Sequence, residues 1–295
     1  MMTSIMGQTK EYIKKLIAIF IALGVWQLVA MYVNTPILIV TPFAVVRRLC
    51  TIWQETGFLS SIWFSFYHIV GGYFIAIATG VVAAVLAKKW AFIETLLWPW
   101  VAVIKSVPVA SFVVICLIWL STRRLSVFIA FLITFPVIYQ NLLAGLKNLD
   151  KKMDEVAFVY KMTLISKLRY IVMPQLKPFI FSACSISAGM AWKAGVAAEV
   201  IGIPSGSIGK QLYLAKTGLD TSGLLAWTVI IVILAVGFEK VFLFVLSNVL
   251  GMRKNNSGGK LTGNVESQSN SLKKQTSDAG KLIAGAGKMD SKEDV

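Results

Sequence analysis

Long apolar runs separated by short polar stretches dominate this sequence. A helix of about 20 apolar residues, rising about 1.5 Å per residue, crosses the hydrocarbon layer of a membrane. The pattern predicts six such spans, over residues 16–33, 62–87, 96–120, 125–146, 178–201 and 224–249. We therefore expect an all-α polytopic membrane protein with about six transmembrane helices, whose membrane domain covers residues 16–252.

Prolines interrupt two of these runs. Pro99 and Pro108 fall in the third run and Pro136 in the fourth. A proline inside a helix removes a backbone hydrogen bond, which is tolerated at membrane depth where neighbouring protein or water satisfies the freed carbonyl. We expect the third span to be kinked or broken. Residues 34–60, between the first two spans, are predicted to be a loop carrying a short amphipathic helix.

Composition supports a membrane protein. The 295 residues are 57% hydrophobic and only 15% charged, which is more apolar surface than a soluble domain of this size buries. The net charge is +15, and in a membrane chain such a basic excess is typical of cytoplasmic loops, so no nucleic-acid partner is expected. Cys50, Cys116 and Cys184 are widely spaced in apolar runs, which indicates small core residues rather than a disulfide or metal site.

The basic residues also predict the orientation. With residues 1–15 as a cytoplasmic N-terminus, cytoplasmic lysines and arginines outnumber the outer ones about two to one, as the positive-inside rule requires. The pairs Arg47 and Arg48, and Arg123 and Arg124, fall on the outer side and weaken this asymmetry. We predict a multi-pass protein of the cell membrane with both termini in the cytoplasm. Residues 253–295, rich in Ser, Gly and Lys, are predicted to be a disordered polar cytoplasmic tail.

A charged segment over residues 147–177 breaks the apolar pattern, and from Asn148 it reads NLDKKMDEVAFVYKMTLISKLRYIVMPQLKP. It resembles the cytoplasmic loop of permease subunits of binding-protein-dependent ABC importers. That loop carries E-A-A, a Gly four residues after the second Ala, and I-x-L-P nine residues further on. The matching positions here are Glu155, Val156, Ala157, Lys161, Ile171, Met173 and Pro174.

Two positions depart from the family pattern. Val156 stands where the family has its first Ala, and Lys161 stands where it has Gly. Glycine at that position permits a sharp turn between two short helices, because it adopts positive φ without steric cost. Lys161 must therefore either accept a positive φ at some cost or let the turn be made differently.

The resemblance implies the MetI-like ABC permease fold, with residues 147–177 as a cytoplasmic coupling loop between the fourth and fifth spans. It implies ATP-binding cassette ATPase subunits, a second permease copy in a homodimer and an external solute-binding protein as partners within the lipid bilayer. A short helix that presents Ala157, Phe158, Tyr160 and Met162 would lodge in a groove of the ATPase. The alternative is a basic amphipathic loop lying on anionic lipid.

The nucleotide is expected on a partner chain. No G-x-x-x-x-G-K-[ST] sequence occurs here, so we expect this chain to bind no ATP or other cofactor and not to be an enzyme. Two rival functions are an ion-gradient-driven secondary transporter and a membrane-bound enzyme. Neither is favoured, because no intramembrane Asp or internal repeat is found and only one histidine is present.

A second stretch, AWKAGVAAEVIGIPSGSIGKQLYLA from Ala191, is similar to permeases of the nitrate, sulfonate and taurine branch. In that branch an Ala-Glu pair precedes a Gly-x-x-Gly loop, and Ala198, Glu199, Gly206 and Gly209 occupy those places. The resemblance covers about residues 16–250 and implies a small anionic solute. A vitamin precursor is the alternative, because close relatives carry such solutes.

Ionisable residues inside spans indicate function by default, because they are costly in lipid. Lys193 and Lys105 are candidate residues of the translocation path, where they would favour an anion. Snorkelling to the interface is the alternative for Lys105. Glu199 is a third candidate, as an outer-gate or structural residue. His68, the single histidine, is expected to donate to a backbone carbonyl rather than to relay protons.

Overall fold

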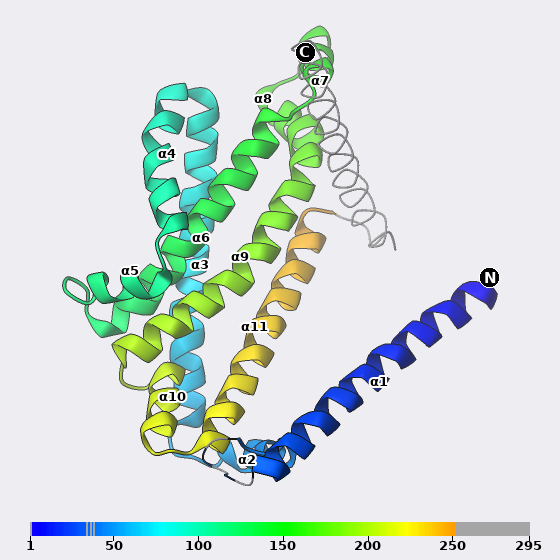
Figure 1. The fold of residues 1–295 in the computed structure, drawn as a ribbon. Coiled ribbons are helices and arrows are strands. Elements are labelled where there is room, and N and C mark those ends of the chain that lie inside the picture. Colours follow the sequence, from blue (N-terminus) through cyan, green and yellow to red (C-terminus); the bar gives the residue numbers. More distant parts are fainter. Residues whose placement is uncertain (1, 34, 36, 38, 252–295) are drawn as a thin grey trace, which may run out of the picture. The chain divides into compact units, whose positions relative to one another are not determined.

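The computed structural model describes residues 2–33, 35, 37 and 39–251, and all regular structure within these ranges is helical. The chain divides into two units, residues 1–246 and residues 247–295, and the following description concerns the first. The predicted tail, residues 253–295, lies outside the described residues. Figure 1 shows the elements: α1 (Met2–Val33), α2 (Pro42–Ile52), α3 (Phe58–Lys89), α4 (Ala91–Ser106), α5 (Val109–Cys116), α6 (Thr122–Lys147), α7 (Lys151–Val159), α8 (Leu164–Lys167), the π-helix η1 (Leu168–Val172), α9 (Met173–Gly202), α10 (Ile208–Thr217) and α11 (Thr221–Val249).

All six predicted spans are helical. Four helices are long and apolar enough to cross a membrane: α3, α6, α11 and the continuous helix Leu164–Gly202. The third predicted span is broken, as expected: α4 and α5 meet at an angle of 105° around Val107 and Pro108. The apolar part of α1, Ile17–Val33, is a shorter helix. The predicted amphipathic helix between the first two spans is α2.

The boundary between the charged segment and the fifth span differs from the prediction. A helix begins at Leu164 and continues for 39 residues to Gly202, so residues 164–177 are not a loop. At about 1.5 Å per residue this helix is about 58 Å long, whereas the hydrocarbon layer of a membrane is only about 30 Å thick. Pro174 does not end it, because it lies in the first turn of α9, directly after the π-helical turn, where a missing N–H is tolerated.

Helices α3 and α6 pack with their backbones very close to each other. Small residues recur along α3, and a Cβ atom at Gly72 would lie 2.2 Å from the carbonyl oxygen of Val127 in α6. Two turns further on, Gly80 of α3 lies against Ile138, so the two helices run in the same direction. Small residues let helices approach closely in lipid, where dispersion replaces the hydrophobic effect as the driving force. The buried small residues of this stripe are Gly72, Ala76, Gly80, Ala84 and Ala87.

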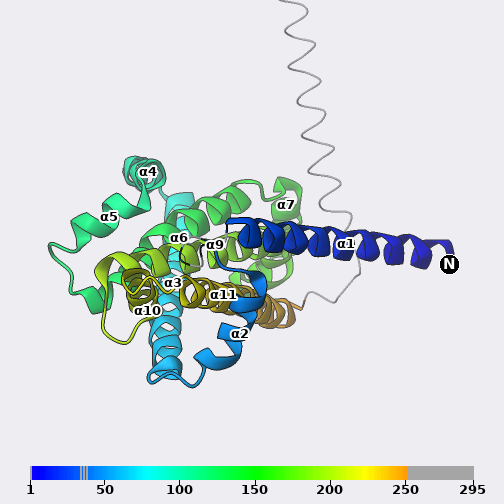
Figure 2. The ribbon, with the colours of Figure 1, turned by 60° about the horizontal axis from the view of Figure 1, so that its bottom comes forward.

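Helix α9 runs antiparallel to this pair and completes the core. The hydroxyl of Tyr73 in α3 donates to the carbonyl of Cys184 in α9 at 2.9 Å. Figure 2, viewed from a different side, also places α9 beside α6 and α11. Cys116 and Cys184 are buried, as predicted, whereas Cys50 on α2 is exposed.

Helix α11 packs on α3 and α9 through aromatic rings. Phe238 and Phe242 both meet the ring of Tyr73 edge to face, with centroids 5.5 and 5.4 Å apart. The hydroxyl of Ser185 in α9 donates to Glu239 Oε1 in α11 at 2.7 Å. This bond gives the carboxylate a partner inside a predicted span, where an unpartnered one is costly.

The contact of Gly72 with α6 predicts a paired mutational result. Gly72→Ala is expected to destabilise the protein by about 1–3 kcal/mol, since the new methyl group overpacks the α3–α6 contact. Gly71→Ala is the matched control, because nothing lies within 4 Å of a Cβ atom there. Thermal unfolding of both purified variants in detergent measures the difference. Equal unfolding temperatures would contradict this account of the packing.

Candidate functional site

Helix α7 is attached firmly to the long helix. It begins four residues after α6 ends, and the side chain of its N-cap residue Asp150 accepts from the amide of Lys152 at 2.9 Å. The Gln175 side chain accepts from the Asp150 amide at 2.9 Å and donates to the Ile171 carbonyl at 3.1 Å. These contacts connect α7 to both α6 and α9.

The turn after α7 is made at Lys161. Its φ is +48°, in the left-handed region that favours glycine. The amide of Met162 donates to the Ala157 carbonyl and the amide of Lys161 to the Phe158 carbonyl, both at 3.0 Å. These two bonds form the Schellman motif that ends many helices. Of the two geometries open to Lys161, the structure thus has the positive φ.

Lys161→Gly is expected to stabilise the end of α7 by about 1 kcal/mol, since a residue with a Cβ atom pays about 1–2 kcal/mol in this conformation. Hydrogen exchange at the amides of Lys161 and Met162 should slow about fivefold, as this free energy requires.

Lys161→Ala keeps the Cβ atom and serves as the matched control, with no slowing expected. Lys152→Gly, at an ordinary helical position of α7, should instead weaken the helix. If the glycine and alanine variants at position 161 exchanged equally fast, the turn would carry no such cost.

Large apolar side chains surround this turn and face outward. Phe158 is 85% exposed and Tyr160 is 76% exposed, and Leu164 and Ile165 at the start of the long helix are similarly open. We call residues 158–165 the α7 turn. An apolar patch of this kind marks an interaction surface.

The other residues that match the family motif differ in how exposed they are. Ala157 is only 5% exposed, so a partner would contact the neighbouring aromatic residues and not this side chain, contrary to the expected presentation of Ala157. Ile171 is also buried, whereas Glu155 and Pro174 are exposed and Met162 is half-buried. The small side chain at position 157 lets α7 turn its inner face toward the protein.

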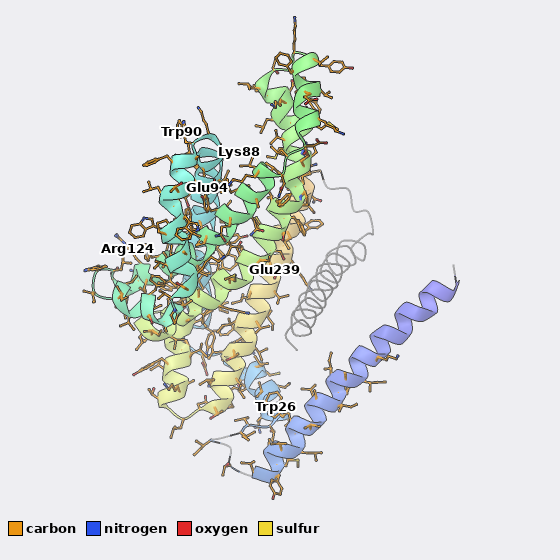
Figure 3. The ribbon with its side chains drawn as sticks, turned by 45° about the horizontal axis from the view of Figure 1, so that its top comes forward. Trp26, Lys88, Trp90, Glu94, Arg124 and Glu239 are labelled. Atoms are coloured by element: carbon orange, nitrogen blue, oxygen red, sulfur yellow. The ribbon has the colours of Figure 1, made fainter. Side chains whose placement is uncertain are left out.

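Polar contacts link α4 to α6 on the same side of the bundle. Lys147 at the end of α6 pairs with Glu94 of α4, and Figure 3 shows Glu94 near Lys88 and Trp90 at the start of α4. Lys105, a candidate path residue, donates to Gln140 Oε1 in α6 at 2.8 Å. Between these two contacts lies a cavity of about 320 Å³, lined in part by Glu94 and Lys147.

Among the described residues, the three candidate path residues form no hydrogen bond or ion pair with one another. Lys193 on α9 is exposed, although Trp192 and Ala194 on either side of it are buried. Glu199 is completely buried. Lys105 donates to Gln140 in α6. A role for any of them in the path stays a prediction.

Glu199 joins three elements at one end of the bundle. Its Oε2 accepts from the Ser65 hydroxyl of α3 at 2.6 Å and from the Gly209 amide of α10 at 3.2 Å. The Ser65 oxygen in turn accepts from the Ile208 amide at 2.9 Å. A Cβ atom at Gly209 would lie 2.3 Å from the Cβ atom of Glu199, so only glycine fits. This geometry explains the Ala-Glu and Gly-x-x-Gly signature, and it favours the structural alternative for Glu199.

Glu199→Ala is expected to destabilise the attachment of α10 by about 1–3 kcal/mol, because Ser65 and Gly209 lose their buried acceptor. Glu199→Gln retains one oxygen and should cost less. Limited proteolysis at α10, together with thermal unfolding, measures the loss. Glu239→Ala is the control, since Glu239 has a single half-buried serine contact; an equal loss there would refute the assignment.

An ion-pair cluster around Arg48 joins α2 to the start of α11. Arg48 of α2 bonds to Glu55 and, at 3.3 Å, to Asp220 before α11. Burial acts to raise the pKa of Asp220, but hydrogen bonds from Ser222 and Gly223 and the Arg48 charge outweigh it and lower this pKa below its usual value. The 172-residue separation hides this contact from local sequence patterns.

His68 behaves as the sequence indicates. Its Nδ1 lies 2.7 Å from the Phe64 carbonyl one turn earlier. Since a carbonyl only accepts, Nδ1 is the donor in this contact.

Taken together, the broken third span, the protruding helix with its exposed turn and the small-residue packing define a polytopic helical permease. Residues 76–254 match the family model described as "Binding-protein-dependent transport system inner membrane component". This match covers more than half of the chain, and the protein belongs to this family.

Several relatives transport anions according to their names. The nitrate import permease NrtB of Leptolyngbya laminosa is 26% identical over 72% of this chain and 77% of its own length. A Bacillus subtilis protein assigned to aliphatic sulfonate transport as the permease SsuC is 25% identical, over 74% of this chain and 80% of that protein. The bicarbonate transport permease CmpB of Synechococcus elongatus is 25% identical over 55% of each chain.

Proposed function

We propose that this permease moves a small anion across the cell membrane, driven by a separate ATPase that engages the α7 turn. The observation that carries the proposal is the exposed cluster around Phe158 and Tyr160, at the end of α7 and directly before a helix too long to be covered by lipid. The cluster matches the position of the family's coupling loop. It offers the apolar anchors that a helix needs in order to lie in a groove.

The contacts of α7 supply a mechanism of transmission. Gln175 ties the start of α7 to α9, and Lys147, just before α7, pairs with Glu94 of α4. When the ATPase subunits close on ATP, the α7 turns of two permease copies are drawn together. The attached spans then rock as rigid bodies, because packed helices shift between discrete arrangements.

The family supports an assembly with an ATPase and an external solute-binding protein, and we propose that a second copy of this chain completes it as a homodimer. This chain supplies the path, and the solute-binding protein delivers the solute. In this proposal residues 1–15 and the end of α11 are cytoplasmic, on the same side as Lys88, Lys89 and Lys147. ATP is bound and hydrolysed on the partner chain.

The anionic solute rests on two independent supports. The named relatives carry nitrate and bicarbonate, and one is assigned to sulfonates. Within this chain, the described parts of the spans expose the cation Lys193 on α9 and hold Lys105 near the break of the third span. A vitamin precursor remains the alternative solute, and transport assays with both classes would separate them.

The coupling proposal predicts that Phe158→Ser together with Tyr160→Ser abolishes co-purification of the ATPase encoded beside this chain and lowers solute uptake at least tenfold. Both side chains are exposed, so folding should be unaffected, and thermal unfolding of the variant in detergent checks this. Glu155→Gln tests the motif carboxylate in the same assay.

Trp98→Ser is the matched control, because Trp98 is also an exposed aromatic residue but lies on α4 away from the α7 turn. It should leave ATPase binding intact. Undiminished co-purification and uptake in the double variant would refute a coupling role for the α7 turn.

A further inference from the structure

The arginine pair at positions 123 and 124 is unexplained by the orientation of the chain, because it falls on the outer side. Arg123 lines a cavity of about 480 Å³ formed by the first turns of α3 and α6 and the loop between α9 and α10. These elements lie at the Glu199 end of the bundle, since Ser65 of α3 meets Ile208 of α10 there. The cavity is therefore on the opposite side from the α7 turn.

Within the described part of the chain, Arg123 forms no ion pair. The ion pairs among the described residues join Arg48 to Glu55 and Asp220, and Lys147 to Glu94. Arg123 instead lies over the ring of Phe64, with its guanidinium carbon 5.8 Å from the ring centroid. A guanidinium held by a cation–π contact keeps its planar fork of donors available for a carboxylate or sulfonate.

Aromatic groups form the walls of the same cavity. Phe64 stacks on His68 at 4.0 Å, and Trp63 and Tyr67 add two exposed rings on the next faces of α3. His68 is held in this wall by the hydrogen bond from its Nδ1 to the Phe64 carbonyl at 2.7 Å. Such walls bind a flat or apolar body rather than a hydrated ion.

We propose that this Arg123 cavity is a binding site for an organic anion, with the acidic group on Arg123 and an apolar or aromatic body against Trp63 and Tyr67. The inference rests on the proposed function and narrows it: the solute is an organic sulfonate or carboxylate received on the outer side. Nitrate and bicarbonate are much smaller than a cavity of about 480 Å³ and leave the aromatic walls unused.

An anionic lipid headgroup shares the chemistry of the acidic group. The structure favours a solute, because lipid sites gather several cations, whereas a single arginine enters this cavity. Arg124, the next residue of α6, lines a different cavity with Leu120 and Phe128. Figure 3 labels Arg124.

The test is equilibrium binding of radiolabelled benzenesulfonate to the full chain in nanodiscs of phosphatidylcholine. We expect saturable binding of one molecule per chain. Arg123→Gln should weaken it at least tenfold, and Arg124→Gln, the matched control, less than twofold. Tyr67→Ala should weaken the binding of benzenesulfonate more than the binding of methanesulfonate. Nitrate should displace the radiolabelled ligand only at concentrations at least tenfold higher than those at which unlabelled benzenesulfonate displaces it.

Four results would overturn the proposal: no saturable binding, equal losses in the two arginine variants, competition by nitrate as strong as by benzenesulfonate, or loss of binding when phosphatidylglycerol replaces part of the lipid. The last result would assign the cavity to a headgroup.

Co-purification of the ATPase with the Arg123→Gln variant is measured in parallel. Intact co-purification beside a failed binding test leaves the α7 coupling proposal standing.

Discussion

The continuous helix from Leu164 to Gly202 is the constraint on which the rest of the structure depends. It is longer than the hydrocarbon layer is thick, so one end must leave the membrane while the other holds the buried carboxylate of Glu199. The Glu199 end of this helix therefore organises α3 and α10. Its other end lies beside α7 and the exposed turn, so a single element connects the two ends of the bundle.

The two ends of the bundle are held by different kinds of interaction. At the Glu199 end, one carboxylate oxygen and the Ser65 hydroxyl accept from backbone amides of α10, which ties α9 and α3 to that helix. At the α7 end the contacts are half-exposed, such as the Lys147 pair with Glu94. Exposed ion pairs contribute about 0–1 kcal/mol and are easily broken. The Glu199 end is thus held by buried contacts, whereas the α7 end is held by contacts that break more easily.

Much of the fold could be predicted from the sequence, because lipid forces apolar backbone into helices and so the apolar runs mark them. The break at Pro108 was predictable from the requirements of proline, whereas the sequence left open whether Lys161 takes a positive φ or the turn is made differently. The continuity of the helix from Leu164 into the fifth span was not predictable, because the charged segment, although compatible with a helix, is set apart from the apolar span by Lys167, Arg169 and Lys177. The role of Gln175 and the Arg48 contact with Asp220 depend on residues brought together only by the tertiary fold.

The π-helical turn at Leu168–Val172 has a geometric consequence for the α7 turn. A π-turn holds one more residue than the α-helical ladder around it, and each α-helical residue advances the azimuth by about 100°. The extra residue is therefore accommodated with almost no change of azimuth, and shortening this stretch by one residue would restore the regular ladder while the Phe158 cluster keeps its direction. A single-codon deletion would be tolerated there, whereas the same deletion elsewhere in the helix would turn the cluster by about 100°.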